Sequence, residues 1–147
     1  MVGTKLKKII FMLLIFNIIY VILLSIVNAE RSYTLNEVVA SVICAEACGE
    51  GEVGMYAVAN VIANRSRKYN ITPYEVVKQK NQFYGYIASN REELYNQCGK
   101  IADRLTANIM KLDDITNGAI FFKTINEKKR SWHQVFTIKI GNHLFYK

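Results

Sequence analysis

The chain has 147 residues, of which 51% are hydrophobic and 21% charged, and its net charge is +7. This composition excludes a disordered chain, and the length suggests one domain once any targeting segment is set aside. No run of basic residues is long enough for a nucleic-acid footprint, so nucleic acid is not an expected partner. A mildly basic surface suits an anionic polymer of the cell envelope, and it serves solubility equally well.

The N-terminus combines a basic stretch with an apolar segment. Three lysines within the first eight residues precede the uncharged run 9–27. This run is longer than the roughly 7–15 apolar residues of a signal peptide and close to the ~20 that span a bilayer. Val27-Asn28-Ala29 places residues of small or modest size before a possible signal-peptide cleavage site after Ala29. Residues 1–29 are therefore predicted to be a signal peptide or a membrane anchor, and the rest of the chain is predicted to be exported.

Residues 34–147 are predicted to form one domain that begins with helices. Thr34 and Glu37 fit a capping box, which opens a helix with apolar residues at helical spacing. Glycines 49 and 51 are expected to end it, and a second helix is expected over about 53–65.

Two further helices are expected before the chain changes character. Thr72, Pro73 and Glu75 fit a second capping box, with proline at the first helical position. Ser89 or Asn90 is expected to cap a long helix with an apolar face. Residues 135–146 then alternate in part around a Gly-Asn pair, which indicates a β-hairpin. The predicted class is α+β, with helices first and a small antiparallel sheet last.

The segment between the first two helices contains three closely spaced glutamates. On a helical wheel, Glu46 falls within about 20° of Val39, in the middle of the apolar face. A carboxyl group placed there either acquires a raised pKa, as a general acid needs, or pairs with a base such as Arg65. Glu50, beyond the helix end, is a second catalytic candidate, a substrate ligand or a cap. Glu52 is most simply a charge that complements the dipole of the next helix.

Three cysteines lie in the exported part, at positions 44, 48 and 98. An oxidising compartment permits one disulfide. Cys44 and Cys48 are poorly placed to bridge each other on one helix, so a bridge from one of them to Cys98 is the better pairing. Three buried thiols remain an equal alternative.

Metal-dependent and nucleophilic chemistry were also considered. His133, His143 and the cysteines could supply zinc ligands, but neither C-x-x-C nor H-E-x-x-H spacing occurs. A Cys–His nucleophile is not indicated, because nothing in the sequence places a histidine beside a cysteine. Among the many aromatic residues, most are expected in the core. Some in the 82–86 loop and around Trp132 are candidates to stack on sugar rings.

Four segments together resemble the cell-wall hydrolase family typified by the spore cortex-lytic enzymes. The first, "AEACGEGEVGMYAVANVIANR" (45–65), is similar to the opening of that family's catalytic domain. "VVKQKNQF" (76–83), "DDITNGAIFF" (113–122) and "IGNHLFYK" (140–147) follow in the family's order. The resemblance covers residues 41–147. Cysteine at position 48, where arginine is usual, and the sequence "YGYIASN" after Phe83 depart from the family pattern.

The resemblance implies a lysozyme-like domain that cleaves the MurNAc-β-1,4-GlcNAc bond of peptidoglycan. It also implies lytic transglycosylase chemistry, in which one glutamate acts as acid and no cofactor or metal is needed. The catalytic candidates are Glu46 and Glu50. The candidate substrate-binding residues are Gln82, Phe83, Tyr84, Trp132 and His143. A non-catalytic peptidoglycan-binding envelope protein of the same fold is the alternative function, and a zinc amidase or peptidase is a weaker one.

Overall fold

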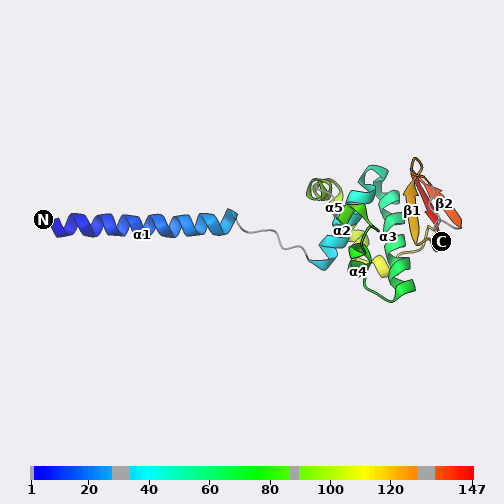
Figure 1. Ribbon diagram of the computed structural model, residues 1–147, viewed down its shortest axis with the longest axis horizontal. Coiled ribbons are helices and arrows are strands. Elements are labelled where there is room, and N and C mark those ends of the chain that lie inside the picture. The colour runs from blue at the N-terminus through cyan, green and yellow to red at the C-terminus, as the bar shows by residue number, and fades with distance from the viewer. Residues whose placement is uncertain (1, 28–33, 87–89, 129–134) are drawn as a thin grey trace. The chain divides into compact units, whose positions relative to one another are not determined.

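The computed structural model describes residues 2–27, 34–86, 90–128 and 135–147, and in the first range the side chains of 8 and 10–21. The chain divides into two compact units, Met1–Ser32 and Tyr33–Lys147. The described part of the first unit is helix α1 (Val2–Val27), drawn in Figure 1. Within the described ranges, no helix is both long and apolar enough to cross a membrane. The signal peptide or anchor remains a prediction.

Helix α2 (Leu35–Ala47) begins at the predicted capping box and carries the first glutamate of interest near its end. The Thr34 side chain accepts a hydrogen bond from the Glu37 amide, and the Glu37 carboxylate accepts one from the Thr34 amide. A short 3₁₀ turn, η1 (Cys48–Glu50), follows, and Gly51 has a φ of 68°. The glycine is needed here because this backbone conformation is strained for other residues. The predicted break between the first two helices is confirmed.

Helix α3 (Gly51–Tyr69) lies between the other helices and the sheet (Figure 1). It extends beyond both ends of the predicted 53–65 helix, and Asn70 ends it in the left-handed conformation with a φ of 52°. Val58 and Ile62 pack into the core shared with α2, whereas Ala57 and Val61 pack with Ala119 and Phe145 of the sheet side. A helix buried on both sides accounts for its run of alanine and valine.

Three shorter helical elements and α5 complete the helical part of the described residues. Helix α4 (Pro73–Lys78) starts at the second predicted capping box, and η2 (Tyr84–Tyr86) follows it. Helix α5 (Arg91–Ala107) packs against α2, and η3 (Ile109–Lys111) continues from it. Asn90 occupies the cap position of α5, but its side chain makes no capping hydrogen bond. Ser89, the other predicted cap, lies outside the described residues.

The sheet has three antiparallel strands in the order β1 (Phe121–Thr124), β3 (His143–Tyr146), β2 (Phe136–Ile140). Strands β2 and β3 form the predicted hairpin, and Gly141 in its turn has a φ of 55°. Strand β1 pairs with β3 and leaves its other edge next to the helices (Figure 1). The α+β prediction is therefore confirmed.

The loop before β1 is tied to α3 by a carboxylate. Asp114 accepts hydrogen bonds from the side chains of Asn64 and Thr116 and from the amides of Thr116 and Gly118. Asn60, also on α3, accepts one from the amide of Ile115. These contacts fix where β1 starts and thereby place its edge against α3.

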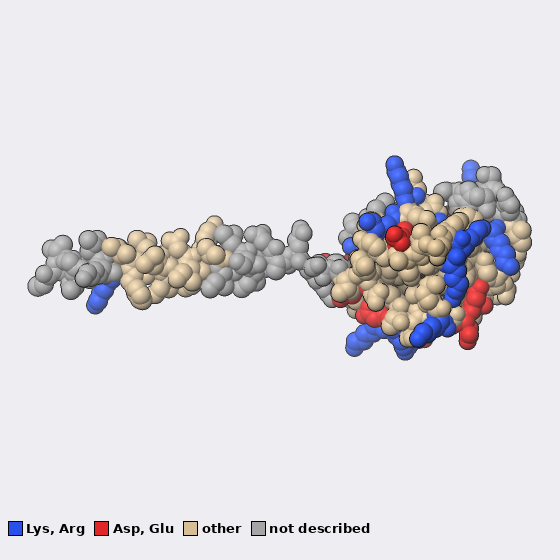
Figure 2. Space-filling view, turned by 90° about the horizontal axis from the view of Figure 1, so that it is seen from below, with Lys and Arg blue, Asp and Glu red and all other residues tan. Residues whose placement is uncertain are grey.

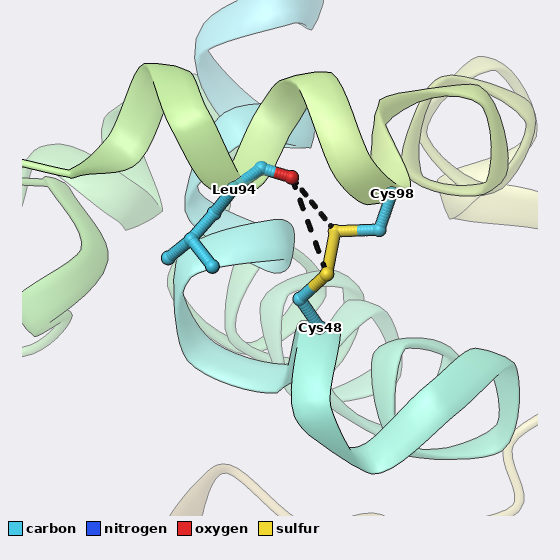
Figure 3. Close-up of a disulfide and its surroundings, with 3 residues drawn as sticks. All are labelled: Cys48, Leu94 and Cys98. Carbon is cyan, nitrogen blue, oxygen red and sulfur yellow. Dashed lines mark hydrogen bonds between the residues drawn. A yellow bond between two sulfur atoms is a disulfide. The ribbon is translucent and has the colours of Figure 1, made fainter.

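A disulfide joins Cys48, just past α2, to Cys98 on α5, and Figure 3 shows the bridge between the two elements. Both sulfur atoms lie against the Leu94 carbonyl oxygen, at 4.0 and 3.2 Å. These contacts are not hydrogen bonds, because disulfide sulfurs carry no proton. Cys44 is a free, buried thiol. The pairing of one helix-α2 cysteine with Cys98 is confirmed, and the bridge fixes the end of α2 that carries the glutamates.

Candidate functional site

Glu46 lies in the last turn of α2 and is half-buried. Its Oε1 accepts a hydrogen bond of 2.6 Å from the backbone amide of Gly85 in η2. The turn can approach this closely because residue 85 is a glycine. A Cβ at that position would lie 2.8 Å from the Cβ of Ala45 and 2.9 Å from the carbonyl oxygen of Val42. The contact orients the carboxyl group toward the space between the helices and β1.

The surroundings of Glu46 favour its protonated form. Burial is the largest influence and raises the pKa of its carboxyl group. The amides of Gly85 and Tyr84 act in the opposite direction, and the negative charge of Glu127 raises the pKa further. The net pKa is above that of an ordinary glutamate, so the group keeps its proton to a higher pH.

A cavity of about 350 Å³ opens beside Glu46. Its walls come from α2, α3, the segment after α4, β1 with the loop that follows it, and the start of β3. The residues that line it are Glu46, Val61, Arg65, Asn81, Gln82, Tyr84, Ile120, Phe121, Phe122, Lys123, Thr124, Glu127 and His143. The cavity therefore presents two carboxyl groups, of which Glu46 has the raised pKa, together with aromatic surface and several hydrogen-bonding side chains.

Three of the predicted substrate-binding residues line this cavity. Gln82 lies on its wall, Tyr84 is 73% exposed at its margin, and His143 is buried at the start of β3. Phe83 instead belongs to the core, where it packs near Phe122, and it does not line this cavity. Trp132 lies outside the described residues.

His143 is unusual because it is buried and incompletely hydrogen-bonded. Only 4% of its surface is exposed, and its Nδ1 has no hydrogen-bond partner among the described residues. Its ring makes edge contacts with Phe122 and Phe145. Burial lowers the pKa of the imidazole, while the charges of Glu50 and Glu127 raise it, and the net shift is downward. The ring is therefore neutral at pH 7.

Glu50, the second catalytic candidate, has a different environment. Its two oxygens accept hydrogen bonds from the backbone and side-chain amides of Asn142 at 2.9 and 3.0 Å. These bonds lower the pKa of its carboxyl group. The φ of 55° at Gly141 favours glycine at the hairpin turn, and a Cβ there would displace the Glu50 carboxylate. Glu50 does not line the cavity, and it connects the end of α2 to the sheet.

Glu52 lies in the first turn of α3, where the sequence placed a charge that complements the helix dipole. It also forms an exposed ion pair with Arg104 of α5. This glutamate has no contact with the cavity. The three glutamates thus have three different surroundings, although they lie within seven positions of one another.

The sequence did not identify the cationic side of the cavity. Arg65 was considered only as an ion-pair partner for Glu46. In the described part of the chain it makes no such pair, and its Nη2 donates instead to Gln79 and Gln82. Lys123 was not singled out, because a lysine directly after an apolar strand run resembles an ordinary edge residue. Glu127 belonged to a charged loop segment with no helical or strand pattern.

Zinc chemistry gains no support from the cysteines. Cys48 and Cys98 are joined to each other, and a disulfide offers no thiolate to a metal. Among the described residues, no group of three or more His, Cys, Asp or Glu side chains is arranged to hold a metal ion. His133, the other histidine in that hypothesis, lies outside the described residues.

Comparisons with known proteins agree with the sequence resemblance and with the fold. The model of the cell wall hydrolase family matches residues 49–146. The catalytic domain of the germination-specific lytic transglycosylase SleB from Bacillus anthracis is 24% identical, with a TM-score of 0.61. That match covers 81% of this chain and 100% of the other. The catalytic domain of the Bacillus cereus SleB protein is 24% identical, with a TM-score of 0.63 over 82% and 96% of the two chains. The comparison with curated proteins gave no match.

Proposed function

The chain belongs to the cell wall hydrolase family, and on that premise we propose that it cleaves the MurNAc-β-1,4-GlcNAc bond of peptidoglycan as a lytic transglycosylase, with Glu46 as its single general acid. The observation that supports this most is the setting of Glu46. It is a half-buried carboxyl group with a raised pKa, held by Gly85 at the wall of a 350 Å³ cavity. A raised pKa favours the protonated form that a general acid must supply.

The proposed reaction needs one acid and no water. Glu46 donates its proton to the glycosidic oxygen that leaves with the N-acetylglucosamine residue, and the bond from that oxygen to C1 of the muramic acid breaks. The C6 hydroxyl of the same muramic acid then attacks C1. Its proton passes to the Glu46 carboxylate, which restores the acid, and the product is a 1,6-anhydro sugar. The Gly85 amide holds Oε1 throughout, so Oε2 is the oxygen assigned to carry the proton.

A transglycosylase is favoured over a two-carboxylate hydrolase by the position of the other acids. Hydrolysis requires a second carboxylate to act as nucleophile or to activate water. Glu50 is occupied by Asn142 outside the cavity. Glu127 lines the cavity but is exposed and lies on the loop after β1. Because Glu127 is the carboxylate besides Glu46 that lines the cavity, it is the residue that would act as the second carboxylate if the enzyme were a hydrolase.

The family implies action in the cell envelope, where peptidoglycan is found. We propose that residues 1–29 deliver the domain there, either as a cleaved signal peptide or as an anchor in the cytoplasmic membrane. The three N-terminal lysines and the uncharged run 9–27 support this proposal. N-terminal sequencing of the protein recovered from the cell envelope distinguishes the two: a start near Glu30 indicates cleavage, and an intact N-terminus indicates an anchor.

Product analysis tests the proposed reaction. Purified sacculi are digested with the wild-type protein, and the soluble muropeptides are identified by mass spectrometry. We expect 1,6-anhydro-muramyl products, each 18 Da lighter than the hydrolysed sugar because no water is added. Products with reducing ends would show that the enzyme is a hydrolase, with Glu127 as the candidate second carboxylate. Free stem peptides whose release a chelator stops would assign an amidase. Binding to sacculi with no product would assign a non-catalytic role.

A further inference from the structure

The cavity beside Glu46 contains a buried positive charge that has no ion-pair partner among the described residues. Arg65 on α3 exposes only 5% of its surface. Its Nη2 donates to the neutral amide oxygens of Gln79 and Gln82 at 2.8 and 2.7 Å. Its Nε is buried and has no hydrogen-bond partner among the described residues. The guanidinium also lies over the rings of Phe83 and Phe121, 5.5 and 5.7 Å from their centroids.

The described contacts do not compensate the charge of the buried Arg65 guanidinium. Arginine stays charged in proteins, and burying its charge is costly unless a negative group compensates it. Two amide oxygens and two aromatic faces solvate the charge of Arg65 without neutralising it. Because Nη2 is occupied and Nε is sealed from solvent, Nη1 is the nitrogen left for a ligand in the cavity that Arg65 lines.

A second buried cation lines the same cavity. Lys123 on β1 is 6% exposed, and its ammonium donates to the carbonyl oxygens of Thr124 and Glu127. An ammonium has three donors, so one remains for a ligand. Lys123 follows Phe121 by two strand positions, and these two side chains therefore point to the same face, about 7 Å apart. Arg65 lies over the Phe121 ring and lines the same cavity as Lys123.

Neither acidic residue of the cavity contacts these two cations as an ion-pair partner. Burial raises the pKa of Glu46, and Glu127 is exposed on the loop after β1. No ion pair joins either acid to Arg65 or Lys123 in the described part of the chain. On the face shown in Figure 2, basic and acidic side chains are interspersed.

We propose that Arg65 and Lys123 form a carboxylate-binding subsite, which receives a carboxylate borne by the muramic acid unit of the substrate. This inference rests on the proposed function, since it takes a glycan strand as the ligand. Two sources supply that chemistry: the lactyl carboxylate of a strand without peptides, and the α-carboxylate of a stem peptide. A guanidinium and an ammonium that line one cavity suit a carboxylate. N-Acetylglucosamine has no such group, so the subsite distinguishes murein from neutral glycans.

Binding measurements on a non-cleaving background test the subsite. The full-length Glu46→Gln protein, kept soluble in mild detergent, is titrated by calorimetry with four tetrasaccharides. The first is the neutral N-acetylglucosamine oligomer. The second alternates N-acetylglucosamine with muramic acid that bears free lactyl carboxylates. In the third, these carboxylates are converted to methylamides. In the fourth, each lactyl group carries an L-Ala-D-Glu dipeptide. We expect the free-lactyl or the dipeptide ligand to bind about 10-fold or more tighter than the neutral and methylamide ligands.

Variants then assign the preference to the two cations. Lys123→Gln in the same background is expected to lose most of the preference for ligands that carry a carboxylate. Arg65→Lys keeps a charge but not the planar fork, so it is expected to lose part of this preference. Arg104→Gln is the matched control, because this arginine pairs with Glu52 away from the cavity. Equal affinity for all four ligands would overturn the subsite, as would a preference that Lys123→Gln leaves intact. If a variant fails to fold by circular dichroism, the ligand series alone decides.

The same ligands separate this inference from the proposed function. Cleavage of the muramic oligomer by wild-type protein, without any carboxylate preference in binding, would support the function and refute the subsite. A carboxylate preference without cleavage would support the subsite and refute the function. Tighter binding of the free-lactyl ligand assigns the subsite to peptide-free strands, and tighter binding of the dipeptide ligand assigns it to the stem peptide.

Discussion

The backbone amide of Gly85 donates a 2.6 Å hydrogen bond to Oε1 of Glu46, although 39 positions separate the two residues. The bond brings η2 against the end of α2, and it exists because position 85 has no side chain. The same glycine thus fixes the orientation of the proposed acid and one wall of the cavity beside it.

Gly85→Ala is expected to weaken both stability and activity. The added methyl would overlap Ala45 and the Val42 carbonyl, and such overpacking destabilises a protein by about 1–3 kcal/mol. Displacing the turn also moves the carboxyl group, and a 1 Å misplacement can reduce a rate by roughly 10²-fold. Denaturant unfolding and the rate of glycan cleavage measure the two effects. Gly49→Ala is the control, since a Cβ there meets nothing within 4 Å. Wild-type activity in Gly85→Ala would contradict the assigned role.

Glu50→Gln is expected to affect stability more than chemistry. The native hydrogen bonds to Asn142 lower the pKa of Glu50 below its ordinary value of 4.5. The ionised group therefore stabilises the fold above pH 4.5, and this contribution is lost as the pH falls through the lower, folded-state pKa. Unfolding free energies of wild type and Glu50→Gln should differ at pH 7 and converge in acid. A constant difference across that range would argue against the Asn142 contact as its source.

The raised pKa of Glu46 predicts that stability changes with pH in the opposite direction. Burial raises its pKa above 4.5, so the protonated form is favoured in the fold and stability falls as the pH rises through the raised value. The cleavage rate should decline over the same range, because a general acid must carry its proton. Glu46→Gln, a neutral mimic of the protonated acid, should be more stable than wild type at pH 7 and similar to it below pH 4.5. A cleavage rate that rises through this range would contradict the acid role.

Reduction of the disulfide is expected to destabilise the domain. The bridge between Cys48 and Cys98 spans 50 positions, and a loop of that size corresponds to about 4 kcal/mol in the chain-entropy model. For wild type and for Cys44→Ala, which keeps the bridge, the urea midpoint should be lower with reductant than without it. Cys98→Ala should already be weakened and should not respond to reductant. A wild-type midpoint unchanged by reductant would show that the bridge contributes little.

Apart from the bridge to Cys98, the features predictable from the residue pattern depend on neighbouring residues. The two capping boxes join residues three positions apart, and the hairpin turn is a local Gly-Asn pair. The inward direction of Glu46 followed from helical periodicity alone. Each of these depends on backbone geometry within one element, so the sequence pattern contained the necessary information.

Features that depend on tertiary packing were not predictable. Glu50 accepts its hydrogen bonds from Asn142, 92 positions later, and this contact lowers its pKa, whereas burial raises that of Glu46. Phe83 was expected to touch substrate but packs into the core. Arg65 and Lys123 line one cavity because β1 is placed beside α3. No local pattern in the sequence specifies that proximity.

The most direct test of the central claim compares two single variants on the same substrate. Glu46→Gln and Glu50→Gln each replace one carboxylate by an amide of the same shape, and both are assayed for release of anhydro-muropeptides from purified sacculi at pH 7. Our account predicts that Glu46→Gln abolishes the products while Glu50→Gln, checked for folding, still forms them. Loss of products in Glu50→Gln with their retention in Glu46→Gln would contradict the assignment of Glu46 as the acid.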